Sequence, residues 1–185
     1  MKKEIVEWLV AIVIAVVLIF AIRTFLFVSF TVDGESMDPT LEDGDRVIVN
    51  KFIDNFNGYD MDDLIVFNSA AGPAYVKRVI GEAGDTVEMI DKQVYVNGEA
   101  VNQDYVAHTG DSYLDNFILS DLPSGSGDDS EVGVDEIPEG KLLVLGDNRP
   151  VSRDSRDFGL VDEEEVIGKV QLRYWPFNEI AVNFD

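Results

Sequence analysis

The stretch Gly34-Glu-Ser-Met-Asp-Pro-Thr-Leu41 decides how the chain is organised, because it separates a long apolar run from an acidic remainder rich in strand-like segments. Gly34 permits backbone angles that other residues resist, while Pro39 fixes its own φ and disfavours helix at Asp38. A stiff segment of this kind can hold the hydroxyl of Ser36 in one place, as a nucleophile requires. The competing interpretation is an ordinary turn, since Ser, Asp and Pro are common turn residues.

The apolar run before this stretch predicts a membrane anchor. Residues 8–22 carry no charged or polar side chain, and residues 5–27 reach the roughly 20 mostly apolar residues that a bilayer-spanning helix needs. Glu7 and Arg23 lie near its ends, where long side chains reach headgroups. A buried core helix is seldom apolar on every face, and a cleavable secretory signal is shorter and ends in small residues. We therefore expect one transmembrane helix within residues 1–28.

The charges around this run predict its orientation. Lys2 and Lys3 precede the run and favour a cytoplasmic amino terminus, although Arg23 at the other end weakens that signal. Residues 29–185 would then form a domain outside the cytoplasm.

Composition narrows the chemistry of that domain. The net charge is −22, from 14 basic and 36 acidic residues, and so acidic a surface disfavours nucleic-acid binding and attraction to anionic lipid. The chain has no cysteine and one histidine, His108, which excludes cysteine nucleophiles, disulfides and zinc sites built from several histidines. We expect neither a metal nor a cofactor. A serine nucleophile would need His108, a lysine or a carboxylate as its general base.

Short apolar runs separated by turn residues predict an all-β domain over residues 29–185. Gly84-Asp85 and Asn97-Gly98 are turn signals between such runs. Residues from about 104 to 140 are instead rich in Gly, Ser and Asp, as in a variable polar loop. His108 falls at the start of this loop, and we interpret it as a surface histidine. The strand-like runs are residues 46–51, 64–67, 74–80, 85–90, 93–98, 141–146, 166–170 and 171–175.

Lys77 is an unusual residue for a strand. Alternation in the run Tyr75-Val-Lys-Arg-Val-Ile80 places Lys77 on one face and Arg78 on the other, each among apolar neighbours. If the Lys77 face is buried, desolvation lowers its pKa, and enzymes bring lysine bases to a pKa of roughly 7–8 in this way. A neutral lysine can accept the proton of a serine hydroxyl. The alternative is that both cations reach solvent at a sheet edge.

A third block follows an apolar strand at residues 146–159. It contains three arginines, three aspartates and two serines. Such a density of donors and acceptors can form a charge-assisted network that fixes the shape of the loop and orients a nearby amine. The alternative is a solvated, charge-balanced turn.

Together these blocks resemble the bacterial type I signal peptidases, membrane-anchored Ser–Lys proteases that remove signal peptides from exported proteins. The resemblance implies compact antiparallel β-sheets of the signal-peptidase kind and covers nearly the whole chain. After the anchor, the matching motifs are Ser36-Met-x-Pro-Thr-Leu41, Gly44-Asp45, Asp63-Leu-Ile-Val-Phe67, Tyr75-Val-Lys-Arg-Val-Ile-Gly81, Gly84-Asp85, Gly146-Asp-Asn-Arg149, Ser152-x-Asp-Ser-Arg156, Gly159 and Arg173-Tyr-Trp-Pro-Phe177.

The resemblance implies that Ser36 is the nucleophile and that Lys77 is the general base for both acylation and hydrolysis. Ser152 matches the family serine that hydrogen-bonds the lysine amine. Gly34 stands where some relatives carry a serine, so the oxyanion would be held by the Ser36 N–H with another backbone N–H or water. The supporting residues of the third block would be Asp147, Asp154 and Arg156.

The implied substrates are preprotein signal peptides with small residues, typically alanine, one and three positions before the cut. The implied setting is the bilayer of the cytoplasmic membrane. Among the departures from the family pattern, Glu35 adds a negative charge beside the nucleophile. The apolar pockets would involve Phe30, Val32, Met37, Leu41, Val47, Val66, Tyr75 and Val76.

Three rival functions stay open at this point. One is a Ser–Lys peptidase that cuts itself, with Ala70-Ala71-Gly72 as the candidate site, or one dedicated partner such as a pilin. Another is a non-catalytic, membrane-tethered binding or assembly domain of the same fold, against which the retention of both Ser36 and Lys77 argues. A carboxylate-based protease lacks the expected glycine-flanked acidic pair.

Overall fold

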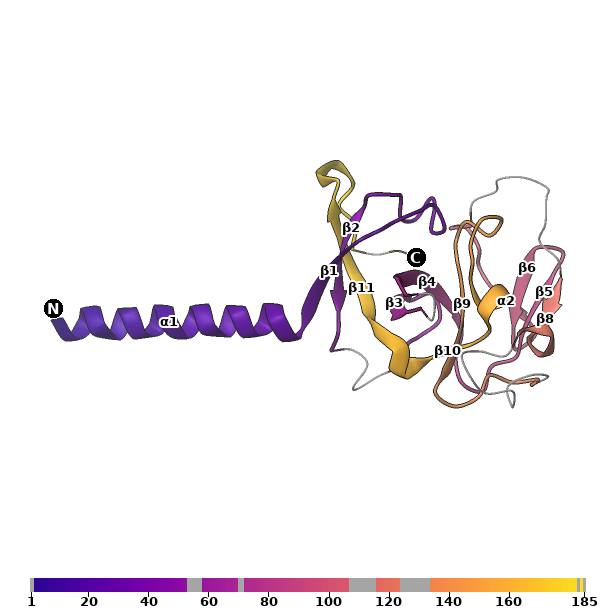
Figure 1. The fold of residues 1–185 in the computed structure, drawn as a ribbon, viewed down its shortest axis with the longest axis horizontal. Helices are drawn as coiled ribbons and strands as arrows, with labels where there is room; N and C mark the ends of the chain where they lie inside the picture. Colours follow the sequence, from indigo (N-terminus) through magenta and orange to yellow (C-terminus); the bar gives the residue numbers. More distant parts are fainter. Residues whose placement is uncertain are drawn as a thin grey trace.

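The computed structural model describes residues 2–52, 58–69, 72–106, 116–123, 134–182 and 184. A long helix, α1 (Lys2–Phe25), projects away from a β domain (Figure 1). Neither glycine nor proline interrupts this helix, and its large apolar side chains between Val6 and Phe20 are exposed, Trp8 to 72% and Phe20 to 71%. Within the described residues, none of the helices has the combined length and apolarity to cross a membrane. The predicted helix is present, but its predicted transmembrane character is not confirmed.

The larger of two sheets has seven strands in the order β1–β2–β11–β3–β4–β9–β10, all paired antiparallel. The interior strands β3 and β9 each carry a run of four consecutive apolar residues buried on both faces, as expected for strands covered on both sides. The bounds are β1 (Phe27–Thr31), β2 (Arg46–Asn50), β3 (Leu64–Asn68), β4 (Ala74–Gly81), β9 (Lys141–Leu145), β10 (Val161–Asp162) and β11 (Val166–Trp175).

The smaller sheet has the order β7–β6–β5–β8 and lies on the side of the domain away from α1 (Figure 1). Two-residue turns join β5 to β6 and β6 to β7, and both residues of each turn have positive φ. These turns are Asp91-Lys92 and the predicted Asn97-Gly98. The bounds are β5 (Val87–Ile90), β6 (Gln93–Val96), β7 (Glu99–Ala100) and β8 (Phe117–Ile118).

Short helices complete the described part, and three apolar clusters form its core. One cluster packs beneath β1, β2 and β11, a second between β3, β4 and β9, and a third under the smaller sheet. The short helices are α2 (Ser155–Phe158), η2 (Leu119–Asp121), η4 (Glu163–Glu165) and η5 (Phe177–Glu179).

The prediction of an antiparallel β domain is confirmed, with one correction. Part of the predicted polar loop between about residues 104 and 140 forms β8 and η2, because Phe117 and Leu119 are buried in the core of the smaller sheet. His108 and the pair Ala70-Ala71 lie outside the described residues.

Candidate active site

Ser36 lies in the turn between β1 and β2, and two buried side chains hold this turn. Met37 and Leu41 are fully buried in the core cluster beneath β1, β2 and β11, and the Leu41 N–H donates to the Met37 carbonyl at 2.9 Å. Gly34 has a φ of +94°, and its N–H donates to Asp43 Oδ1 at 2.8 Å. The turn therefore presents Ser36 from a fixed base.

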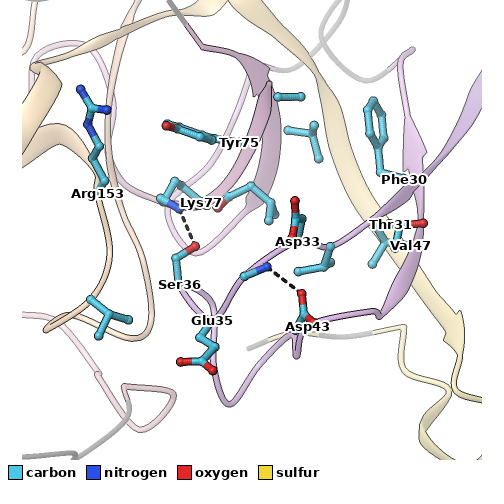
Figure 2. A pocket seen from close by; sticks show the side chains of 16 residues that line it. Phe30, Thr31, Asp33, Glu35, Ser36, Asp43, Val47, Tyr75, Lys77 and Arg153 are labelled. Atoms are coloured by element: carbon cyan, nitrogen blue, oxygen red, sulfur yellow. Dashed lines mark hydrogen bonds between the residues drawn. The ribbon is translucent and has the colours of Figure 1, made fainter. Parts of the chain in front are cut away.

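Lys77 reaches this serine from β4, and only 3% of the residue is exposed. Its Nζ donates to Ser36 Oγ at 2.7 Å (Figure 2). It also donates to the Val76 carbonyl at 3.0 Å. The ring of Tyr75 lies 5.4 Å from Nζ. The structure thus joins two side chains that are 41 residues apart in the sequence.

Burial lowers the pKa of Lys77 from its ordinary 10.5 to about 8, because the apolar surroundings disfavour the ammonium form. The carboxylates of Asp154 and Asp147 oppose this fall in pKa, and Arg156 adds to it. An appreciable fraction of the amine is therefore uncharged close to neutral pH.

Arg78 occupies the opposite face of β4 and is fully buried. It binds Asp147 through two hydrogen bonds, from Nε at 3.0 Å and from Nη2 at 2.8 Å, and its guanidinium carbon lies 3.8 Å from the centre of the Tyr105 ring. The alternative that Lys77 and Arg78 reach solvent at a sheet edge is wrong, because β4 is an interior strand between β3 and β9.

Hydrogen bonds within the loop after β9 fix its shape, as the density of charged residues at positions 146–159 predicts. Asp154 is fully buried and accepts hydrogen bonds from the Gly146 N–H at 3.0 Å and from Arg156 Nε and Nη2, both at 2.8 Å. It also caps α2 through the Arg156 N–H. Arg156 Nη2 additionally donates to the Arg149 carbonyl at 2.8 Å. The loop is thus held against β4 in a single shape.

Asn148 joins this loop to the nucleophile turn, a role that the sequence did not reveal. Its main-chain N–H donates to the Ser36 carbonyl at 3.1 Å, and its Nδ2 donates to the Glu35 carbonyl at 3.0 Å. The close approach requires glycine at position 146, because a Cβ there would lie 2.5 Å from the Ser36 carbonyl oxygen. The Gly146-Asp-Asn-Arg149 motif was visible in the sequence, but its partner 113 residues away was not.

Ser152 does not make the expected hydrogen bond to the lysine amine. Its Oγ is buried and has no hydrogen-bond partner in the described part of the chain, whereas Lys77 Nζ bonds to Ser36 and Val76. The hydroxyl lies instead beside Gly146, where an added Cβ would collide with it.

A groove of about 620 Å³ opens beside the Ser36–Lys77 pair. Six of the eight predicted pocket residues line it: Phe30, Val32, Val47, Val66, Tyr75 and Val76. Met37 and Leu41 do not line it, because the turn directs their side chains into the core. The prediction missed seven further lining residues: Thr31, Asp33, Glu35, Asp43, Ala74, Val151 and Arg153.

Comparisons of the sequence with known proteins agree over nearly the whole chain, and a solved structure agrees over part of it. The family model described as signal peptidase, peptidase S26, matches residues 5–175. A signal peptidase IB from Staphylococcus aureus (strain MRSA252) is 44% identical over 190 residues, which cover 100% of this chain and 97% of that protein. A signal peptidase I from Bacillus amyloliquefaciens is 39% identical over 181 residues, covering 97% of this chain and 92% of that protein. The crystal structure of a signal peptidase I from Enterococcus faecalis is similar with a TM-score of 0.51 and 36% identity, covering 61% of this chain and 97% of that one.

Proposed function

The chain belongs to the signal peptidase family, peptidase S26, and from this premise we propose that Ser36 and Lys77 are the catalytic pair of a serine endopeptidase that removes signal peptides from preproteins. The observation that carries the proposal is the 2.7 Å contact between Ser36 Oγ and the Nζ of a buried lysine whose pKa is lowered to about 8. A serine hydroxyl is a weak nucleophile unless a base of this kind takes its proton.

In the proposed reaction, Lys77 accepts and returns one proton during acylation of Ser36 and again during hydrolysis of the acyl ester. The neutral amine accepts the hydroxyl proton while Ser36 Oγ attacks the scissile carbonyl carbon, and the carbonyl oxygen takes the electron pair. When the C–N bond breaks, the ammonium returns the proton to the leaving amine. The amine then accepts a proton from the water that attacks the acyl ester, and returns it to Oγ as the signal peptide leaves.

The groove supports a substrate with small apolar side chains before the cut. Its walls come from the end of β1 and the residues after it, from β2 and β3, and from the start of β4. The apolar lining residues are Phe30, Val32, Val47, Val66, Tyr75 and Val76. We infer alanine-type residues at positions −1 and −3, because their side chains fill a shallow apolar groove without burying a polar group.

We further propose that residues 1–28 anchor the protein in the cytoplasmic membrane and that residues 29–185 act on its outer side. The exposed apolar side chains of α1 support this, since a surface of this extent is unfavourable in water. Trp175 and Phe177, exposed to 42% and 70%, offer a second apolar contact near the lipid surface.

The test is cleavage of a preprotein with an Ala-x-Ala site by the full chain in detergent. We expect Ser36→Ala and Lys77→Met to abolish cleavage, while the surface variants Ser120→Ala and Lys51→Met cleave as the wild type does. The wild-type rate should rise with pH through about 8, because the base must be neutral. Full activity in Ser36→Ala would refute the proposal and favour a non-catalytic domain. A panel of precursors separates a general enzyme from one dedicated to a single partner.

A further inference from the structure

We propose that Asn148 is a positioning residue that aims the main-chain N–H of Ser36 at the oxyanion of the reaction. The inference rests on the proposed function, because it assumes that Ser36 attacks a carbonyl. The inference gives Asn148 a role in orienting the Ser36 N–H, and neither the sequence motifs nor the similarity to known proteins assigns it that role.

The main-chain N–H groups of Gly34 and Ser36 are the two candidate donors to the oxyanion. The Gly34 N–H already donates to Asp43 Oδ1 at 2.8 Å. The Ser36 N–H has no hydrogen-bond partner among the described residues. Of these two N–H groups, only that of Ser36 is therefore free to receive a developing negative charge.

The carbonyl groups on either side of the Ser36 N–H fix the direction in which it points. The Glu35 carbonyl and the Ser36 N–H belong to one planar peptide unit, which is trans, so they point in opposite directions. Asn148 Nδ2 donates to the Glu35 carbonyl at 3.0 Å, which also accepts a longer bond from the Asp38 N–H at 3.3 Å, and the Asn148 N–H donates to the next carbonyl, that of Ser36, at 3.1 Å. Two adjacent carbonyls bound to one residue leave the intervening N–H little freedom to rotate.

Asn148 is itself held in place by the loop to which it belongs. Asn148 is 9% exposed and belongs to the loop that Asp154 and Arg156 brace. Its amide can face the Glu35 carbonyl only through the nitrogen, because a carbonyl accepts and cannot donate. Preorganised donors of this kind stabilise an oxyanion without reorganisation during the reaction.

The variants Asn148→Asp and Asn148→Ala remove the Nδ2 donor and keep the main-chain N–H. Asn102→Asp is the matched control, because Asn102 is exposed and its side-chain oxygen accepts from the Asp104 N–H, which a carboxylate can also do. Loss of a whole oxyanion donor costs about 10²–10³ in kcat, so we expect a misdirected donor to cost between about 10-fold and that limit. KM should stay unchanged, and Asn102→Asp should behave as the wild type.

A peptide aldehyde ending in Ala-x-Ala gives a readout that a purely structural role would not change. Ser36 Oγ adds to the aldehyde carbon and its oxygen takes the electron pair, so the adduct resembles the tetrahedral intermediate. We expect the Asn148 variants to lose aldehyde affinity by the same factor as kcat, while affinity for an uncleavable peptide of the same sequence is unchanged. Dissociation constants refer to the folded fraction alone, so incomplete folding does not obscure the result.

Two results would overturn the proposal. In one, kcat and aldehyde affinity stay at wild-type values in both Asn148 variants. In the other, the Asn148 variants lose affinity for the aldehyde and for the uncleavable peptide by the same factor. Asn148 would then support peptide binding in the groove and not the oxyanion donor. If Ser36→Ala also cleaves, or the wild type forms no aldehyde adduct, the proposed function fails and the role of Asn148 falls with it.

Discussion

Lys77 occupies a buried position in which its ammonium form is unfavourable. The residue is 3% exposed, and burial lowers its pKa to about 8. A fall from 10.5 to about 8 corresponds to about 3 kcal/mol of free energy, since one pKa unit is about 1.4 kcal/mol. The same property that makes the amine a base at neutral pH therefore destabilises the folded domain.

We expect Lys77→Met to be more stable than the wild type at pH 7, with a melting temperature several degrees higher. Below about pH 8 both folded and unfolded wild-type chains carry the proton, so the full cost is present. Between about pH 8 and 10.5 the unfolded chain binds more protons than the folded one, so wild-type stability rises with pH and the difference shrinks.

The measurement is thermal unfolding of both proteins at pH 7 and pH 10, with Lys51→Met as the control for removing a surface lysine. A stability difference that is independent of pH would contradict the lowered pKa of Lys77.

At the scale of single elements, β4 works by presenting two cations to opposite sides of a sheet. Lys77 faces the nucleophile turn, whereas Arg78 binds Asp147 in the loop after β9. Thr40 Oγ1 also donates to Asp147, which ties the far end of the nucleophile turn to the same carboxylate. One strand thus fixes both the base and the loop that surrounds it.

Removing one member of the Arg78–Asp147 pair should be far worse than removing both. We expect Asp147→Ala to lower the free energy of unfolding by about 3–5 kcal/mol, because it leaves a buried guanidinium without its counter-ion. The double variant Arg78→Met/Asp147→Leu should recover most of that loss, since apolar residues of similar volume need no partner. Urea unfolding at neutral pH measures both. If the double variant is less stable than Asp147→Ala, the unpaired guanidinium of Arg78 is not the cause of the loss.

For the whole molecule, an apolar helix is joined to a domain of strongly negative charge. The net charge of the chain is −22, and α1 extends away from the sheets (Figure 1). The large apolar side chains of α1 between Val6 and Phe20 are exposed. Contact with lipid would therefore depend on apolar burial, because anionic headgroups repel the domain.

We expect the full chain to float with neutral phosphatidylcholine vesicles and to gain nothing from anionic phosphatidylglycerol. Binding to the anionic vesicles should increase with salt, since about 0.15 M salt screens exposed charges beyond roughly 8 Å. A Val13→Lys/Val17→Lys variant should stay in the unbound fraction, because lysine near the centre of a span is unfavourable by about 2.5–3.5 kcal/mol. Wild-type protein that fails to float with neutral vesicles would contradict the proposed anchor.

Features with a local cause were predictable from the sequence. Residues 2–25 contain neither glycine nor proline, carry an apolar run over residues 8–22 and form a helix, and Asn97-Gly98 forms a two-residue hairpin turn. Alternation along β4 correctly placed Lys77 and Arg78 on opposite faces, because side chains on a strand point to opposite sides in turn. The matched motifs likewise pointed to the family to which the chain belongs.

What depends on contacts between distant segments was decided only by the tertiary structure. The sequence could not show that Met37 and Leu41 leave the groove for the core, that Ser152 makes no bond to Lys77, or that Asn148 holds the carbonyls of residues 35 and 36. Periodicity assigns a residue to a face of its own element. Which donor meets which acceptor depends on how the loop after β9 packs against the nucleophile turn, and that geometry exists only once the sheet between them has formed.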